Sequence, residues 1–282
     1  MTEPHRHRDQ TLIIDVGMND GNDTAYYLSC GFNVIAVEAN PTLTAAAEDR
    51  FRREIAEGRL TVLNVGIAQD EGDSDFWISE SNHQWSSFSK PIATRRGATV
   101  LAHPIRVRCL PLSAVLKRYG VPYYLKMDIE GYDLIGLESL SEGFAPRYMS
   151  VEFAHGMEIR LLERLLTLGY ARFKLLNQVT FTDKMPIFDR EVGLRSIRKL
   201  YRHAPLLQPL LRGIIRRSDF DTPRNFPEGS SGPFGEKTYG RWMTADGIKS
   251  RYAALRRAYD RAGLVFWWDL HAVHSHDWSW IG

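Results

Sequence analysis

Four ionisable side chains lie near the ends of two apolar stretches of the chain, where they could take part in proton transfer. Asp128 and Glu130 lie at the end of one stretch, and Glu152 and His155 lie at the end of the next. A positioned carboxylate or imidazole can accept the proton of a hydroxyl group, and an imidazole suits this task best because its usual pKa lies near neutrality. These four residues are therefore the candidate catalytic residues.

The same acids could instead bind a metal ion. Asp128 with Glu130 or Glu152 offers oxygen ligands, which Mg²⁺ prefers. The spacing is not that of an all-carboxylate site, so a site without metal is favoured and no metal ligand is assigned. Three histidines near the C-terminus could also be ligands, but exposed histidines in a tail are the commoner case. They are His271, His274 and His276, which lie beside Asp269 and Asp277 in the sequence.

A glycine-bracketed turn follows the first apolar stretch. Asp15 lies near the end of that stretch, and Gly17 and Gly21 bracket a turn that leads into a segment with helical spacing. Glycine permits positive φ and close approach of a ligand to the backbone. A strand-end acid can hold an ammonium group, and free N–H groups at a helix start can hold a carboxylate. The turn therefore suits the methionine part of S-adenosylmethionine, and a tight turn without a ligand is the alternative.

The spacing of these glycines argues against a nicotinamide dinucleotide. Dinucleotide folds use the pattern G-x-G-x-x-G, whereas three residues separate Gly17 from Gly21 here. An NAD-dependent oxidoreductase is therefore disfavoured.

A second acid is in the right place to bind a ribose. The apolar stretch 33–37 ends at Glu38, which Asn40 follows closely. In a βαβ unit such an acid lies beside the first turn, where its two oxygens can accept hydrogen bonds from both ribose hydroxyls. We place Asn40 in the same cofactor site. After the third apolar stretch, Gly66 to Ala68 are expected to face the adenine.

The composition is that of an ordinary globular protein. The chain has 282 residues, a formal net charge of +2, 44% hydrophobic residues and 25% charged residues, so it makes no global case for nucleic acid. Residues 1–10 are polar and lack the apolar core of a signal peptide, and no apolar run is long enough to span a bilayer. Cys30 and Cys109 form no metal motif and no disulfide framework, which indicates reduced thiols. We therefore expect a cytoplasmic protein.

Apolar stretches of strand length alternate with segments of helical spacing as far as residue 182, and this order predicts a doubly wound, parallel α/β sheet. The chain divides into a polar tail, the core, a basic insertion that ends in a Gly/Pro-rich loop, and a C-terminal helix with the last strand. Their ranges are 1–10, 11–182, 183–243 and 244–282.

Three expectations concern individual elements. One helix should span residues 41–57, because a proline opens it and a glycine follows it. Residues 74–78 should form a hairpin arm after the strand at 60–66. If the strand at 123–131 holds to its end, side-chain alternation puts three residues on one face. They are Lys126, Asp128 and Glu130.

The insertion could take part in acceptor binding. Residues 190–217 are strongly basic and amphipathic, so they could contact a membrane surface or an anionic substrate, although a helix packed on its own domain is commoner. The loops at 226–234 and around Trp85 are long and aperiodic, and we expect residues 183–240 to form a lid that selects a hydroxyl acceptor. The sequence does not define the oligomeric state.

Four segments together resemble the FkbM family of S-adenosylmethionine-dependent methyltransferases. They are residues 15–21, 37–41, 125–131 and 151–152, and the resemblance covers roughly residues 11–182. It implies a class I, Rossmann-like methyltransferase fold and O-methylation of a hydroxyl on a sugar, glycolipid or secondary metabolite. The alternative is a binding module that has lost its chemistry and holds a partner through the basic insertion.

The resemblance also implies a role for each matching residue. The methyl-transfer end would be formed by Asp128 and Glu130, and the ribose would be held by Glu38. The methionine part would be held by the first turn, at Asp15, Gly17, Asn19 and Gly21.

Overall fold

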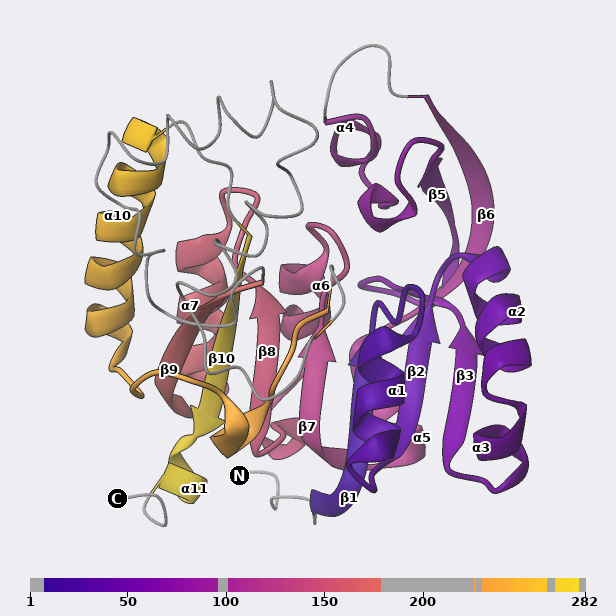
Figure 1. The fold of residues 1–282 in the computed structure, drawn as a ribbon, viewed down its shortest axis with the longest axis horizontal. Helices are drawn as coiled ribbons and strands as arrows, with labels where there is room; N and C mark the ends of the chain where they lie inside the picture. The colour runs from indigo at the N-terminus through magenta and orange to yellow at the C-terminus, as the bar shows by residue number, and fades with distance from the viewer. Residues whose placement is uncertain (1–7, 96–100, 179–225, 227–229, 263–266, 279–282) are drawn as a thin grey trace, which may run out of the picture.

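A computed structural model describes residues 8–95, 101–178, 226, 230–262 and 267–278, and a seven-stranded sheet forms its centre (Figure 1). The strand order is β3-β2-β1-β7-β8-β10-β9. The strands are β1 (Arg8–Val16), β2 (Asn33–Glu38), β3 (Leu60–Asn64), β7 (Val121–Met127), β8 (Tyr148–Glu152), β9 (Tyr170–Asn177) and β10 (Trp268–His274).

The predicted last strand is confirmed as β10, but the sheet is not parallel throughout. β10 lies between β8 and β9 and runs antiparallel to both. The start of β10 therefore lies at the same edge of the sheet as the carboxyl ends of β7 and β8. Asp269 of β10 is the register partner of Glu152 of β8, so an acid from the C-terminal part of the chain joins the predicted site.

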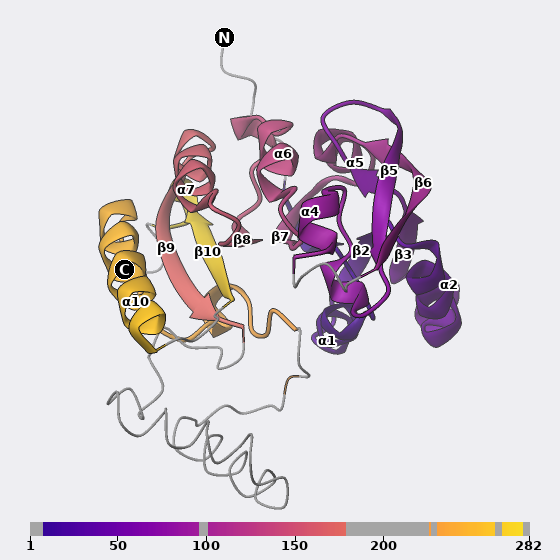
Figure 2. The same cartoon turned by 90° about the horizontal axis from the view of Figure 1, so that it is seen from above.

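Helices cover both faces of the sheet, as the predicted α/β class requires. Figure 2 shows α5, α6 and α7 on one face and α1 and α2 on the other. The helices are α1 (Asn22–Ser29), α2 (Pro41–Arg50), α3 (Arg52–Ala56), α4 (Lys90–Ala93), α5 (Leu112–Tyr119), α6 (Asp133–Glu138), α7 (Glu158–Thr167), α10 (Ala245–Ala262) and α11 (Ser275–Trp278). Among the described helices none is both long and apolar enough to cross a membrane.

The two faces have different chemistry. The face under α5, α6, α7 and α10 carries the larger hydrophobic core, in which β1 contributes Leu12, Ile14 and Val16. The alternate residues of β1, Ile13 and Asp15, point to the opposite face, where aromatic and ionisable side chains are buried. Period-two alternation in β1 thus places Leu12, Ile14 and Val16 in one core and Ile13 and Asp15 on the opposite face.

Two local expectations were wrong. The helix expected over 41–57 is broken at Phe51, whose φ of −110° is not helical and whose ring packs against Gly21 of the first turn. The arm expected at 74–78 forms no hairpin with the preceding strand. It belongs to β5 (Gly72–Ser79), which pairs with β6 (Ala102–Leu110) in a second sheet together with β4 (Gly66–Ile67).

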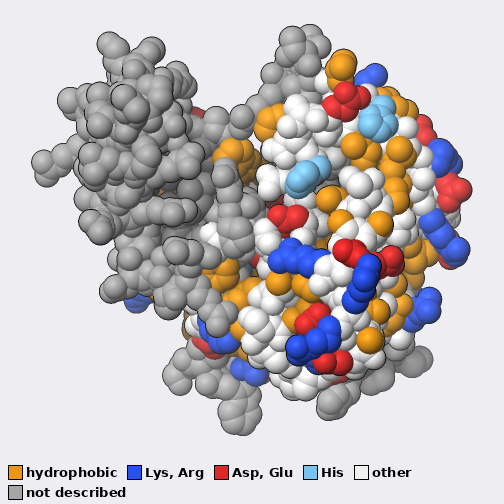
Figure 3. Space-filling view, turned by 45° about the vertical axis from the view of Figure 1, so that its right-hand side comes forward, with side chains coloured by type: hydrophobic (Ala, Val, Ile, Leu, Met, Phe, Trp, Pro, Cys, Tyr) orange, Lys and Arg blue, Asp and Glu red, His pale blue; other side chains and the backbone are white. Residues whose placement is uncertain are grey.

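The surface around this second sheet carries both signs of charge. Ion pairs join Arg106 to Asp75 and Arg108 to Glu71 across β5 and β6, and Figure 3 shows basic and acidic side chains next to one another on this side of the molecule. The basic stretch 190–217 and the strand expected at 179–182 lie outside the described residues.

Candidate active site

The first turn is built on two glycines in the left-handed region. Gly17 has a φ of +81°, and a β-carbon there would lie 1.9 Å from the carbonyl oxygen of Asp128. Gly21 has a φ of +78°, precedes α1, and would place a β-carbon 2.8 Å from the ring of Phe51. Only glycine meets both demands without a shift of the backbone. The predicted turn is therefore present, and it lies in contact with the end of β7.

A buried cluster of charged side chains, Lys126 with Asp15 and Asp23, is bonded to this turn. Nζ of Lys126 donates to the carbonyl oxygen of Gly17 at 2.8 Å and lies 3.3 Å from Oδ1 of Asp15 and 3.8 Å from Oδ2 of Asp23. The other oxygen of Asp15 accepts from the hydroxyl of Thr24 at 2.7 Å. Nearby acids outweigh the effect of burial and raise the pKa of Lys126. Asp15 thus has two partners within the protein, and its predicted contact with an ammonium group stays a prediction.

Glu38 holds the first turn through both of its carboxylate oxygens. Its two oxygens accept from the backbone N–H groups of Asn19 at 2.8 Å and Asn40 at 2.9 Å. Burial raises the pKa of Glu38, while these two N–H donors oppose the shift. Each carboxylate oxygen has a second lone pair, so Glu38 retains the capacity to accept from a ribose. Asn40 caps α2 through its side chain, which accepts from the N–H of Thr42 at 3.0 Å.

Asn19 has an unsatisfied polar atom at the cofactor side of the turn. Its φ is +54°, and its Oδ1 is buried without a hydrogen-bond partner among the described residues. A buried acceptor without a partner is costly in a folded protein, and a bound ligand with N–H or O–H donors would satisfy it. The residues of the turn therefore fit the methionine part of S-adenosylmethionine.

Gly66 begins β4 of the second sheet and Ala68 directly follows that strand. A β-carbon at Gly66 would lie 2.2 Å from the ring of Phe88, so the glycine lets this aromatic ring close against β4. The N–H of Ala68 donates to the carbonyl oxygen of Leu110 at 3.1 Å. The glycine at residue 66 is thus explained by its packing against Phe88. Contact of Gly66 and Ala68 with an adenine stays a prediction.

The expected alternation of Lys126, Asp128 and Glu130 stops before its end. β7 ends at Met127, and Glu130 has a φ of +49°, so the chain has left the extended conformation. Glu130 then turns toward Arg95, whose two terminal nitrogens lie 2.8 and 3.1 Å from its carboxylate oxygens. The loop after β5 is also joined to this turn, because the hydroxyl of Ser87 donates to the carbonyl oxygen of Glu130 at 2.8 Å.

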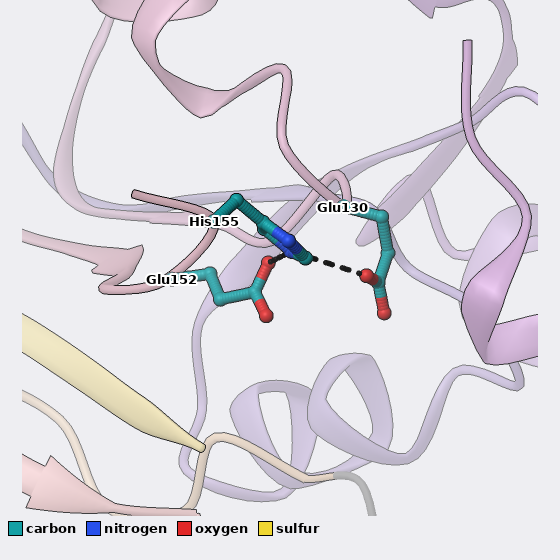
Figure 4. A group of neighbouring side chains, drawn as sticks. All are labelled: Glu130, Glu152 and His155. Carbon is teal, nitrogen blue, oxygen red and sulfur yellow. Dashed lines mark hydrogen bonds and ion pairs between the residues drawn. The ribbon is translucent and has the colours of Figure 1, made fainter. Parts of the chain in front are cut away.

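His155 lies between two glutamates, as Figure 4 shows. Its Nε2 is 3.0 Å from Oε2 of Glu152 and 3.5 Å from Oε2 of Glu130. Burial disfavours the imidazolium, but the hydrogen bonds to both glutamates outweigh burial and raise the pKa of His155 to about 10. The expectation that His155 titrates near neutrality was therefore wrong. A protonated imidazole cannot accept a proton, which leaves the carboxylates as candidates for the base.

Burial raises the pKa of the other acids at this edge of the sheet. The pKa of Glu152 rises to about 7, against the hydrogen bond from His155, and burial also raises that of Asp128, against the charge of Lys126. A carboxylate with a raised pKa is a stronger base at neutral pH. The four candidate catalytic residues thus lie together, and their ionisation is coupled.

Sequence reasoning did not place two further buried acids, Asp133 and Asp269, in this group. Asp133 is the first residue of α6 and is 2% exposed. Asp269 lies near the start of β10, where it pairs with Glu152 at the end of β8, and it is also 2% exposed. Burial raises the pKa of both well above the usual value, and Glu152 and Asp128 add to the shift in each case. The spacing of Asp133 from Asp128 in the loop could have pointed to it. Asp269 could not be found this way, because only the antiparallel pairing brings it here.

The C-terminal histidines were expected to be exposed in a tail, and for two of the three this was wrong. His271 and His274 are 1% and 0% exposed because β10 lies inside the sheet. Burial, with the charge of Lys174, lowers the pKa of His271 to about 3. His271 is therefore neutral, while His276 in α11 is exposed.

The described part of the expected lid is buried against α1. The backbone N–H of Ser231 donates to Asp23 at 2.9 Å, and the hydroxyl of Ser230 also donates to this carboxylate. The ring of Phe234 stacks on Tyr124 with centroids 4.9 Å apart. Residues 230–234 are thus part of the aromatic core, which corrects the expectation of a lid there. Residues 183–225 lie outside the described part of the chain.

The family model described as "Methyltransferase FkbM domain" matches residues 15–172, which include the first turn, Glu38, the acids that follow β7 and the acid that ends β8. No curated protein matches the chain.

Solved structures of methyltransferases are similar to the chain at low identity. One is precorrin-6y C5,15-methyltransferase from Geobacter metallireducens, with 11% identity, TM-score 0.34, and 62% and 71% of the two chains covered. A second is an S-adenosylmethionine-dependent methyltransferase from Geobacter sulfurreducens in complex with S-adenosyl-L-homocysteine, with 11% identity, TM-score 0.35, and 95% and 86% covered. Phosphoethanolamine N-methyltransferase 2 from Haemonchus contortus, in complex with S-adenosyl-L-methionine, gives 11% identity, TM-score 0.35, and 95% and 49% covered. The assignment to a family rests on the family model.

Proposed function

Because the chain belongs to the FkbM methyltransferase family, we propose that it transfers a methyl group from S-adenosylmethionine to a hydroxyl of a sugar or a similar polar molecule. The observation that carries this proposal is the contact between Gly17 and Asp128. This contact brings the turn that fits the cofactor against the strand end that carries the candidate base.

When bound, the cofactor supplies an electrophilic methyl group on a sulfonium. The protein has to hold the acceptor oxygen in line behind that group, and such positioning is worth up to about 7–11 kcal/mol in model reactions. We assign the cofactor to the turn at Gly17, to Asn19 and to Glu38. We assign the acceptor to the adjoining edge formed by Glu130, Glu152 and His155 together with Asp128.

Asp128 is the proposed proton acceptor. It directly follows β7 at the contact with Gly17, and burial raises its pKa, which makes it a stronger base than an exposed aspartate. Glu130 and Glu152 are both engaged by His155, so they are suited to holding the acceptor. The described side chains at this edge are mainly acidic, and this supports a neutral acceptor over the anionic one that the basic stretch 190–217 had suggested.

Calorimetry tests the cofactor assignment. S-adenosylmethionine and its demethylated product should both bind, and NAD should not. Binding of NAD alone would overturn the proposal.

Transfer of a labelled methyl group to a panel of sugars and glycolipids tests the reaction. Asp128→Asn should lower kcat by about 10²–10⁴-fold while the affinity for S-adenosylmethionine stays nearly the same. An unchanged kcat would remove Asp128 as the base.

A further inference from the structure

Three metal-ligand atoms from two loops meet at the acceptor edge. Glu130 comes from the loop after β7, Glu152 ends β8, and His155 lies on the turn that follows β8. One carboxylate oxygen from each glutamate and one imidazole nitrogen lie within 4.8 Å of one another (Figure 4). From this convergence we propose that Glu130, Glu152 and His155 form a binding site for a divalent first-row transition-metal ion such as Mn²⁺.

The spacing of the three atoms fits an ion at their centre. Ligand atoms about 2.1 Å from an ion are about 3.0 Å apart at right angles and about 4.2 Å apart on opposite sides. Nε2 of His155 is 3.0 Å from Oε2 of Glu152 and 3.5 Å from Oε2 of Glu130. Small rotations of these side chains are enough for coordination. One imidazole with two carboxylates suits Mn²⁺, Fe²⁺ or Zn²⁺ better than a purely oxygen-liganded ion.

A fourth group points to a ligand independently. Asp133 is 2% exposed, and its Oδ1 has no hydrogen-bond partner among the described residues. Asp133 lines the same small internal space as Gly131, Glu152 and His155. A buried carboxylate oxygen without a donor is costly, and a cation, or a water molecule on that cation, would satisfy it.

The backbone holds these side chains in place from both loops. Glu130 and His155 have φ values of +49° and +61°, a conformation that is uncommon for residues other than glycine. Gly131 and Gly156 follow them, also at positive φ. The two loops thus turn sharply just where each presents its ligand.

Arg95 fits the role of a residue that orients a ligand. Its guanidinium contacts both oxygens of Glu130, at 2.8 Å for Oε2 and 3.1 Å for Oε1. When Oε2 turns to the ion, Oε1 can keep its hydrogen bond to Arg95, and ligating carboxylates are commonly held in this way. The ion takes the place of the proton that His155 carries on Nε2, and that proton leaves to solvent.

The role of the ion follows from its place next to Asp128, and this part of the inference rests on the proposed function. A cation that binds a hydroxyl oxygen lowers the pKa of that hydroxyl, which eases transfer of its proton to Asp128. Three protein ligands leave coordination positions open on the ion. Two neighbouring hydroxyls could occupy them, so the site selects a vicinal diol, as found in sugars.

Binding of Mn²⁺ to the full-length protein, without cofactor or acceptor, tests the site separately from methyl transfer. Electron spin-echo spectroscopy should show coupling of Mn²⁺ to an imidazole nitrogen in the wild type, and His155→Ala should abolish it. Glu152→Gln should weaken Mn²⁺ binding at least about tenfold. The matched control is His103→Ala, which removes an exposed histidine that is likewise paired with a glutamate, Glu80, at 3.3 Å. This control should bind Mn²⁺ like the wild type.

Two results would overturn the site. One is the absence of imidazole coupling in the wild type at millimolar Mn²⁺. The other is wild-type Mn²⁺ affinity in Glu152→Gln, which decides the question even if His155→Ala does not fold. Failure of S-adenosylmethionine to bind would overturn the proposed function and would leave the result on the metal site standing.

Discussion

The α-carbon of Gly17 lies so close to Asp128 that a β-carbon at residue 17 would stand 1.9 Å from the carbonyl oxygen of Asp128. The cofactor turn and the base are therefore joined through backbone atoms, which no side-chain rearrangement can separate. A change that displaces the backbone of either residue is therefore expected to move the other.

Gly17→Ala should abolish detectable binding of S-adenosylmethionine in calorimetry. The methyl group overlaps Asp128, and a positive φ adds roughly 1–2 kcal/mol for a residue with a β-carbon. Gly58→Ala is the control, because Gly58 has a φ of +71° and no atom lies within 4 Å of the place that a methyl group would take there. The control should lose only that backbone cost in unfolding free energy. Tight cofactor binding by Gly17→Ala would show that the turn is not the cofactor site.

Glu38→Gln should raise the Kd for S-adenosylmethionine about tenfold to a hundredfold. The change removes hydrogen bonds to a charged acceptor, which are worth about 1.5–3 kcal/mol. Glutamine is preferred to alanine because its single amide oxygen can still accept from one of the two N–H groups, of Asn19 and Asn40, that Glu38 holds. Glu57→Gln, at an exposed acid of the same α2–α3 region, is the control. If both variants bind the cofactor equally well, Glu38 is not a ligand.

The pH dependence of stability should report on Asp23. Burial raises its pKa from 3.8 to about 6, against the charge of Lys126. Between these values the folded protein binds more protons than the unfolded chain, so the contribution of Asp23 to stability falls as pH rises from about 4 to about 6. Asp23→Asn removes this titration. The unfolding free energy of the wild type minus that of Asp23→Asn, measured in urea at pH 4, 5 and 7.5, should therefore decrease with pH, and a constant difference would contradict the assignment.

Phe234→Ala should destabilise the fold by about 3–5 kcal/mol, as the loss of a buried aromatic side chain does. Phe234 is 3% exposed and packs against Tyr27 and Tyr124. Phe226→Ala is the control, because Phe226 is only half-buried and meets Tyr26 edge-on at 5.0 Å. Urea unfolding should show less than half the loss for the control. Equal losses would mean that residues 230–234 are not built into the core as described.

Local signals in the sequence were sufficient to predict the glycine turn and the family. Gly17 and Gly21 indicate a turn, and Glu38 ends an apolar stretch, so neighbouring residues alone define both features. The FkbM match over residues 15–172 confirms the family that these motifs suggested. The first strands and helices were predicted for the same reason, since their hydrophobic periodicity is complete within each segment.

The acceptor half depends on contacts between distant segments, which periodicity does not reveal. Asp269 reaches Glu152 only because β10 inserts beside β8, more than a hundred residues away in the chain. Asp23 and Ser230 are 207 residues apart, and their hydrogen bond turned an expected lid into part of the core. The pKa of His155 was misjudged for a related reason. Two glutamates, Glu130 and Glu152, raise it above the usual value of an imidazole, and only the fold brings both of them to His155.

The insertion of β10 between β8 and β9 has a consequence for biosynthesis. β9 ends at Asn177 and β10 begins at Trp268, so the ribosome makes about ninety further residues before the strand that separates β8 from β9 exists. At about 5–20 residues per second this takes on the order of 10 s. During that time β8 and β9 both present unpaired backbone edges, which are templates for association with other chains. During this interval the unpaired edges of β8 and β9 are a defined target for chaperones. The acceptor edge with Asp269 is assembled only after β10 has been synthesised.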